Sequence, residues 1–124
     1  MPSPLAGVWE LVSEEEDGLF IVTETHFMEM TVRSDRTPWP VPLRADSVTD
    51  EMRLDASKGL LFALGGTYEV VSANGNEHEV LYQPVVTKNP TPPRGIPLRV
   101  TIDGDTMSAD VGPRHEVWRR IAAV

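Results

Sequence analysis

The sequence predicts an all-β domain, folded as a single antiparallel barrel of about eight strands with one short helix. Hydrophobic and polar residues alternate with a period of two along most of the chain, as in strands that bury one face. Tight-turn signals, Asn74-Gly75 and Asp103-Gly104, join neighbouring runs. The runs recur at the 8–12-residue spacing of sandwiches and barrels. The expected strands cover residues 8–13, 19–23, 26–33, 62–70, 77–86, 96–103, 107–111 and 115–121.

We expect the sheet to close on itself. An open antiparallel sheet of this size would leave two edge strands exposed, whereas closure pairs every strand. The interior of an eight-stranded barrel either fills with side chains or holds one small ligand.

One segment breaks the alternation and predicts a short helix near residues 48–58. Ser47 to Asp50 has the spacing of a capping box, and Lys58-Gly59 supplies a basic last turn followed by a C′ glycine. Two proline-rich stretches, 37–42 and 89–95, are too short to link domains and are expected to cap the ends of the barrel.

The composition places the chain among single globular domains. Its 124 residues, taken as one domain over 1–124, suffice for a core without disulfides, and there is no cysteine. The net charge of −8 disfavours nucleic acid as a partner. The absence of a signal peptide pattern or a long apolar run leads us to expect a soluble, cytoplasmic protein without membrane contact. The acidic run from Glu14 to Asp17 is interpreted as a solvated turn.

Three short motifs together suggest a family. They are Leu5–Ser13 with its Gly7-x-Trp9 core, Gly65–Val70 followed by His78, and Gly104–Met107 followed by Trp118-Arg119-Arg120. In order and spacing they resemble bacterial lipocalin-like domain proteins over most of the chain. The resemblance implies a calycin-type β-barrel with an internal pocket. It implies little about chemistry, because such proteins include binders and proteins of unknown role.

The resemblance also implies that Trp9 packs at the closed end of the barrel beneath an arginine from the last strand. We place Arg119 there, because the apolar residues Val117 and Ile121 share its parity. Trp118 lies on the other parity and argues for Arg120.

The parity of each strand gives a set of interior residues. On the third strand the charges of Glu29 and Arg33 predict that His26, Met28 and Met30 face inward. The polar side chains expected to share one cavity are His26, Tyr68, His78 and Tyr82. The apolar wall for a ligand is expected from Met28, Met30, Phe62, Leu98 and Val100, with Trp39 either covering the mouth or packing on its own loop. Alternatively, the polar residues satisfy one another or lie at the rim, and the methionines are plain core.

No catalytic motif is present, so the sequence leaves enzyme activity open. If the barrel is an enzyme, His26 or His78 would transfer a proton, and Tyr82 or Tyr68 would polarise a carbonyl group. No metal site is expected, because only His26 and His78 share the interior and zinc needs a third ligand. No cofactor motif is recognisable.

We therefore expect a protein that binds a small hydrophobic or aromatic molecule inside the barrel. One alternative is an acid–base enzyme on the same barrel, such as a cyclase or isomerase acting on a natural-product-like substrate. A second is an interaction module that forms a homodimer or meets a partner protein. The sequence does not choose among the three.

Overall fold

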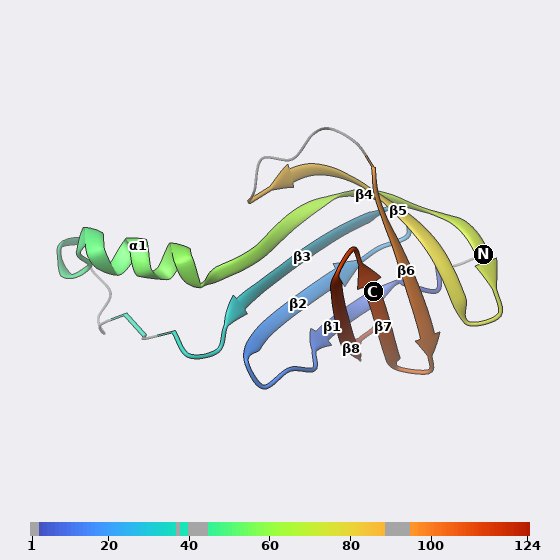
Figure 1. Cartoon of the computed structure of the whole chain (residues 1–124), viewed down its shortest axis with the longest axis horizontal. Helices are drawn as coiled ribbons and strands as arrows, with labels where there is room; N and C mark the ends of the chain where they lie inside the picture. The colour runs from blue at the N-terminus through green and yellow to red at the C-terminus, as the bar shows by residue number, and fades with distance from the viewer. Residues whose placement is uncertain (1–2, 37, 40–44, 89–94) are drawn as a thin grey trace.

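The computed structural model describes residues 3–36, 38–39, 45–88 and 95–124 and forms a closed barrel of eight antiparallel strands (Figure 1). Each strand pairs with its neighbours in the chain, and the last strand pairs with the first. The predicted all-β antiparallel barrel is confirmed. The strands are β1 (Gly7–Leu11), β2 (Glu16–Val22), β3 (His26–Arg33), β4 (Leu60–Asn74), β5 (Glu77–Thr87), β6 (Ile96–Asp103), β7 (Thr106–Val111) and β8 (Arg114–Ala122).

The predicted tight turns lie where the sequence places them. Gly75 and Gly104 adopt left-handed backbone conformations, with φ of 64° and 59°, in the β4–β5 and β6–β7 hairpins. Glycine enters this region without the steric cost that a Cβ atom imposes. The two proline-rich stretches fall largely on residues 37, 40–44 and 89–94, which lie outside the described residues, so their expected capping role is not tested.

The helix is present, but both of its ends differ from the prediction. A 3₁₀ turn, η1 (Ala45–Ser47), precedes α1 (Asp50–Gly59). Thr49 rather than Ser47 is the N-cap, and its hydroxyl accepts from the Met52 amide at 3.1 Å. Gly59 is the last helical residue and not a left-handed C′ residue. A Cβ there would stand 2.6 Å from Cδ of Arg36, so a larger residue would displace that arginine side chain.

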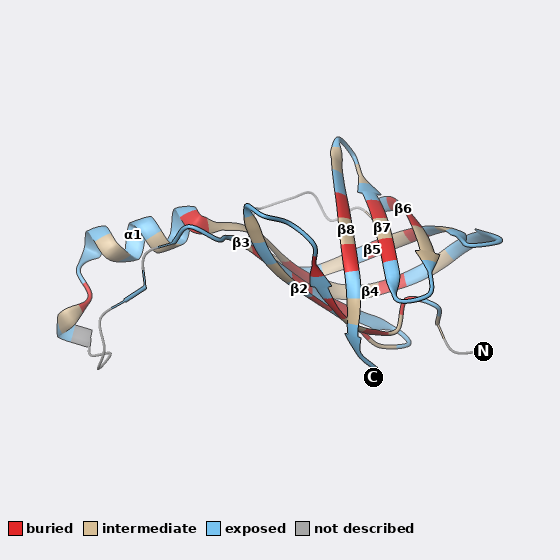
Figure 2. Cartoon of the chain, turned by 90° about the horizontal axis from the view of Figure 1, so that it is seen from below, coloured by how far each residue is buried: buried red, intermediate tan, exposed pale blue. Residues whose placement is uncertain are grey.

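Helix α1 contributes little to the barrel. It extends away from the strands as a continuation of β4, and most of its surface is exposed (Figure 2). Among the described residues, no helix has the length and apolar character that crossing a bilayer requires.

The N-terminal segment closes one end of the barrel. Leu5 and Trp9 are fully buried there, and Nε1 of Trp9 donates to the Leu5 carbonyl at 2.9 Å. The guanidinium of Arg120 lies 4.4 Å from the centre of the Trp9 ring, in cation–π geometry. The expected contact between Trp9 and an arginine is therefore present, but the expected residue, Arg119, is wrong. Arg119 faces outward and pairs with Glu10 at 3.5 Å.

The parity of β8 explains this correction. Trp118 is fully buried, which places Glu116 and Arg120 on the same inward face. Ile121, which we used as an inward marker, is half exposed on the outer face.

Aromatic side chains fill the barrel next to this closed end. Phe27 stacks on Tyr82 with ring centres 3.9 Å apart, and Phe20 packs against Trp118 at 5.4 Å. The buried hydrophobic residues are Leu5, Trp9, Leu11, Phe20, Val22, Phe27, Leu64, Tyr68, Val80, Tyr82, Leu98, Val100, Met107, Ala109 and Trp118.

Strand β3 turns the opposite face inward from the one predicted. Phe27, Glu29 and Thr31 are buried, whereas Met28 and Met30 are 60% and 48% exposed. His26 is also exposed. The prediction assumed that charged residues mark the solvent side. Here the inner face carries a carboxylate, and the apolar methionines line the outer wall.

Substitution of Trp9 tests the closed end. Trp9→Ala is expected to lower the free energy of unfolding by about 3–5 kcal/mol, because it removes a buried aromatic ring together with its hydrogen bond and its arginine contact. Urea denaturation measures the change. The matched control is Trp39→Ala, since Trp39 is 39% exposed and its loss should cost less than 1 kcal/mol, within about the range of surface changes. Equal costs for the two variants would contradict this account of the closed end.

Candidate functional site

Four charged side chains gather inside the barrel toward the end opposite Trp9. Glu16 comes from β2, Glu29 from β3, and Arg114 and Glu116 from β8. We call this set the inner charged cluster. Since β3 and β8 are not neighbours in the sheet, their side chains meet across the interior.

Arg114 bridges two members of the cluster. Its Nη2 donates to Oε1 of Glu16 at 2.8 Å, and its Nε donates to Oε2 of Glu116 at 2.9 Å. Burial opposes the charge on Arg114, but the two carboxylates outweigh it and raise the pKa of the guanidinium. The side chains of Glu16 and Arg114 are 23% and 32% exposed, whereas Glu116 is buried. The cluster therefore leads from solvent at the open end into the interior.

Glu29 lies at the inner end of the cluster. Burial raises the pKa of its carboxyl well above the usual value, and the nearby carboxylate of Glu116, which also exchanges a hydrogen bond with it, raises it further. Arg114 opposes this effect. Because Arg114 donates directly to Glu116, Glu29 is the member of the pair that holds a proton more readily.

Further polar groups lie beside the carboxyl pair. Burial raises the pKa of the Tyr82 hydroxyl, and the neighbouring carboxyl groups of Glu29 and Glu116 raise it further. Thr31 Oγ1 and Trp118 Nε1 are buried and have no hydrogen-bond partner among the described residues. Each stands two positions from a carboxyl on the same inward strand face, Thr31 beside Glu29 and Trp118 beside Glu116. Buried polar groups without partners are rare and mark sites of water, ions or ligands.

Several residues predicted to line the interior do face it. Tyr68, Tyr82, Leu98 and Val100 are buried, and Phe62 packs against the core. The hydroxyl of Tyr68, however, lies 2.6 Å from both the Thr23 carbonyl oxygen, to which it donates, and Ser3 Oγ, from which it can accept, so it helps hold the N-terminal segment in place. Whether these residues bind a ligand stays a prediction.

The predicted cluster of His26, Tyr68, His78 and Tyr82 in one cavity is wrong. His26 lies on the outer surface, where its Nδ1 hydrogen-bonds Thr25 at 2.7 Å. His78 shares the face of Tyr82 but stands four residues away along β5, roughly 13 Å at 3.3 Å per residue. It lies beside the β4–β5 hairpin, toward the closed end.

The predicted apolar wall is also partly wrong, since Met28 and Met30 lie outside the barrel. Met28 lines an apolar surface hollow of about 480 Å³ with Ile21, Gly65, Val85 and Val86. Trp39 borders a different hollow of about 500 Å³ beside α1, together with Arg36 and Asp55. It therefore packs near its own loop and the helix.

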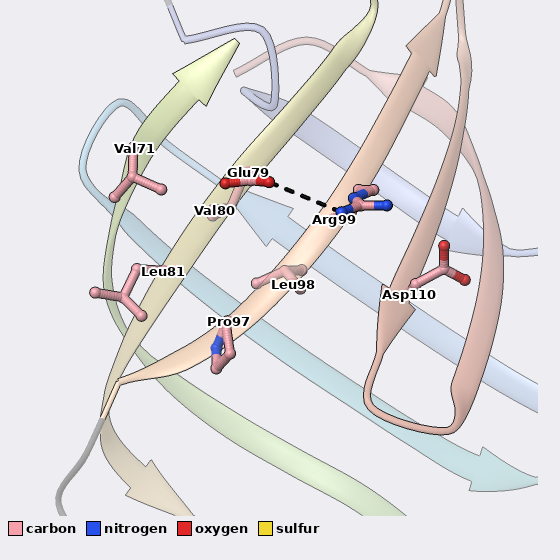
Figure 3. Close-up of a pocket in the computed structure, with 8 residues that line it drawn as sticks. All are labelled: Val71, Glu79, Val80, Leu81, Pro97, Leu98, Arg99 and Asp110. Atoms are coloured by element: carbon pink, nitrogen blue, oxygen red, sulfur yellow. Dashed lines mark ion pairs between the residues drawn. The ribbon is translucent and has the colours of Figure 1, made fainter. Parts of the chain in front are cut away.

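The outer wall of β4–β7 carries another hollow, of about 420 Å³ (Figure 3). Val71, Leu81 and Pro97 give it apolar sides, and an ion pair of 3.8 Å between Glu79 and Arg99 crosses one end. Its lining carries no histidine or buried carboxyl, so the inner charged cluster is the stronger candidate site. Among the described residues, no group of three or more histidine and acidic side chains has metal-binding geometry.

The inner charged cluster was missed by the sequence analysis. The run from Glu14 to Asp17 was interpreted as a solvated turn, yet Glu16 and Asp17 belong to β2 and Glu16 is half-buried in an ion pair. A signal was available in β8. Trp118 is the largest apolar residue of that strand, and its alternation with Glu116 and Arg114 would have placed both charges inside.

The raised pKa of Glu29 predicts a pH-dependent effect of Glu29→Gln. A raised folded-state pKa gives stability that is present below the unfolded value, about 4.3 for glutamate, and is lost as pH rises through the folded value. Glutamine keeps the neutral hydrogen-bonding group, so the variant should gain stability relative to the wild type as pH rises from 4 to 8. Thermal unfolding across that range measures the difference.

Glu10→Gln is the control, because it makes the same chemical change at a glutamate that is half exposed on the outer surface. Its stability difference from the wild type should change little over the range. A Glu29→Gln curve parallel to the wild-type curve would contradict the protonated state of Glu29.

Comparison of the chain with protein-family models, curated proteins and solved structures finds no match. The closed eight-stranded barrel is compatible with the expected calycin-type fold, and membership of a lipocalin-like family stays a prediction.

Proposed function

We propose that this protein binds a small, largely apolar or aromatic molecule in the open half of its barrel. The observation that carries the proposal is the buried carboxyl pair, Glu29 and Glu116, inside a barrel whose other interior residues are mainly apolar. Buried ion pairs rarely add stability over hydrophobic residues of similar size, so they are weak devices for folding. Groups with strongly displaced pKa values concentrate at functional sites.

The surroundings of the pair suit such a ligand. Phe62, Ile96 and Val111 are partly buried and pack against the core at the same end as Arg114, where they offer an apolar surface within reach of solvent. Glu29, Thr31, Tyr82 and Trp118 supply a few polar groups deeper in the barrel. An apolar lining with a few oriented polar groups is the usual composition of small-molecule sites.

A saturable interaction with 2-phenylethanol tests the proposal. We expect the indole N–H resonance of Trp118 to shift on titration in ¹H–¹⁵N NMR, because this donor is buried beside Glu116 without a partner. The resonance of Trp39, outside the barrel, should not move. Phe62→Ala should weaken binding roughly tenfold, through loss of part of an aromatic contact worth about 1.5–3 kcal/mol when fully buried.

Met28→Ala is the matched control, since it removes an apolar side chain from the outer wall and should leave the affinity unchanged. Shifts confined to the residues around Met28 would move the binding site outside the barrel. The absence of any saturable shift would overturn the proposal for this class of ligand.

A second candidate function is acid–base catalysis. It is favoured by two adjacent carboxyl groups of which one, Glu29, holds a proton more readily than the other, Glu116. Glu29 would act as the acid and Glu116 as the base, and such pairs recur in enzymes. Glu116 takes a role here that the sequence analysis gave to His26 and His78.

Hydrogen–deuterium exchange tests the catalytic role. The wild type in D₂O should accelerate exchange at the α-carbon of 4-phenyl-2-butanone by 10²-fold or more over buffer, about the usual contribution of a positioned base. Glu116→Gln should reduce the rate to that of buffer, while Glu10→Gln should not. Equal rates for the wild type and Glu116→Gln would leave binding as the function.

A further inference from the structure

We infer that the ligand of the inner charged cluster is a small primary amine on an apolar or aromatic body, and that its ammonium group takes the place of the proton on Glu29. This inference rests on the proposed binding function and names its ligand class. It excludes carboxylate ligands such as fatty acids.

The net negative charge of the site favours a cationic ligand. Glu16, Glu29 and Glu116 face a single guanidinium, Arg114, inside the barrel. With Glu29 protonated, Glu16 and Glu116 leave one negative charge in excess of Arg114. An anionic ligand would add a like charge in an environment of low dielectric constant, whereas a monocation that displaces the proton of Glu29 leaves the net charge of the site unchanged.

The site also offers hydrogen-bond acceptors for an ammonium group. Glu29 and one oxygen of Glu116 can accept, since Arg114 occupies only Oε2 of Glu116. Thr31 offers a third acceptor, because its Oγ1 is buried without a partner among the described residues. Its Cγ2 lies 3.0 Å from where a Cβ of Gly18 would stand, so the methyl group of Thr31 points toward β2. Three acceptors match the three N–H donors of a primary ammonium group.

The proton balance follows from these groups. An amine with a pKa near that of lysine reaches the site protonated at neutral pH. When it binds between the two carboxyls, Glu29 loses its proton to the solvent and both carboxylates accept from the ammonium. One proton is therefore released for each amine bound, and no covalent bond to carbon changes.

Isothermal titration calorimetry of a matched series tests the inference. The probes are 2-phenylethylamine, 2-phenylethanol and 3-phenylpropanoate, which share a body and differ in charge. We expect the amine to bind at least tenfold more tightly than the alcohol, and the carboxylate to bind more weakly than either. The binding enthalpy of the amine should differ between phosphate and Tris buffers at pH 7 by the amount expected for release of up to one proton, and that of the alcohol should not.

Two variants distinguish a preference for the amine that depends on Glu29 from one that depends on the negative charge of the whole protein. Glutamine imitates the protonated carboxyl that the inference assigns to Glu29, so Glu29→Gln should leave the free protein's charge unchanged and yet abolish proton release and the preference for the amine. Glu10→Gln removes a surface charge of the acidic protein and should retain both. If the preference followed overall charge, Glu10→Gln would reduce it and Glu29→Gln would not, and the inference would fail.

The outcomes distinguish this inference from the proposed function. Binding of the alcohol with no advantage for the amine, or with no proton release, would overturn the ligand class and leave the binding function intact. Failure of all three probes to bind would overturn both.

Discussion

The pairing of β1 with β8 is the constraint on which the interior of this protein depends. It closes the sheet, so every strand has one face that is shut off from bulk solvent along part of its length. Alternation then assigns every second residue to that interior. At the end covered by the N-terminal segment these residues are apolar and aromatic, and toward the other end they include Glu16, Glu29, Arg114 and Glu116. The barrel therefore has an apolar half and a charged half.

The charged half gains little from electrostatics alone. Glu29 and Glu116 approach each other in a place where neither is well hydrated, and only one of them contacts Arg114 directly. A proton on Glu29 removes the repulsion, but the cost of burying a polar group without full hydrogen bonding persists. The energy that holds these groups together comes from the hydrogen-bonded sheet and the aromatic packing between Phe20, Phe27, Tyr82 and Trp118. Folding stability thus maintains an arrangement that would not form by itself, as binding and catalytic sites commonly require.

The architecture could be predicted from the sequence, and the candidate site could not. Strands β5 and β6 alternate aliphatic with polar residues, and there the expected faces hold for Val80, Leu98 and Val100. In strand β3 the alternation predicts the wrong inward face, because both faces contain apolar residues and the only acidic residue, Glu29, faces inward. The partner that makes this placement possible, Glu116, lies 87 residues away on β8, too far for any local pattern to reveal. In β8 the inward face is set by Trp118, which buries far more surface than Val117 or Ile121, so Arg120 and not Arg119 faces inward.

Closure of the barrel by the first and last strands, β1 and β8, has a consequence for the order of folding. Seven of the strand pairs join neighbours in the chain, but β1 and β8 pair residues as distant as Val8 and Ala122, which are 114 positions apart. The entropy lost in joining such distant segments grows with their separation, and topologies rich in distant contacts fold slowly. An open meander of β2 to β7 lacks both strands that hold Arg114, Glu116 and Trp9. The carboxyls of Glu29 and Glu116 consequently meet only when the last pair forms. Proton uptake by Glu29 during refolding, followed with a pH indicator in a stopped-flow mixer, should therefore report the rate at which the barrel closes.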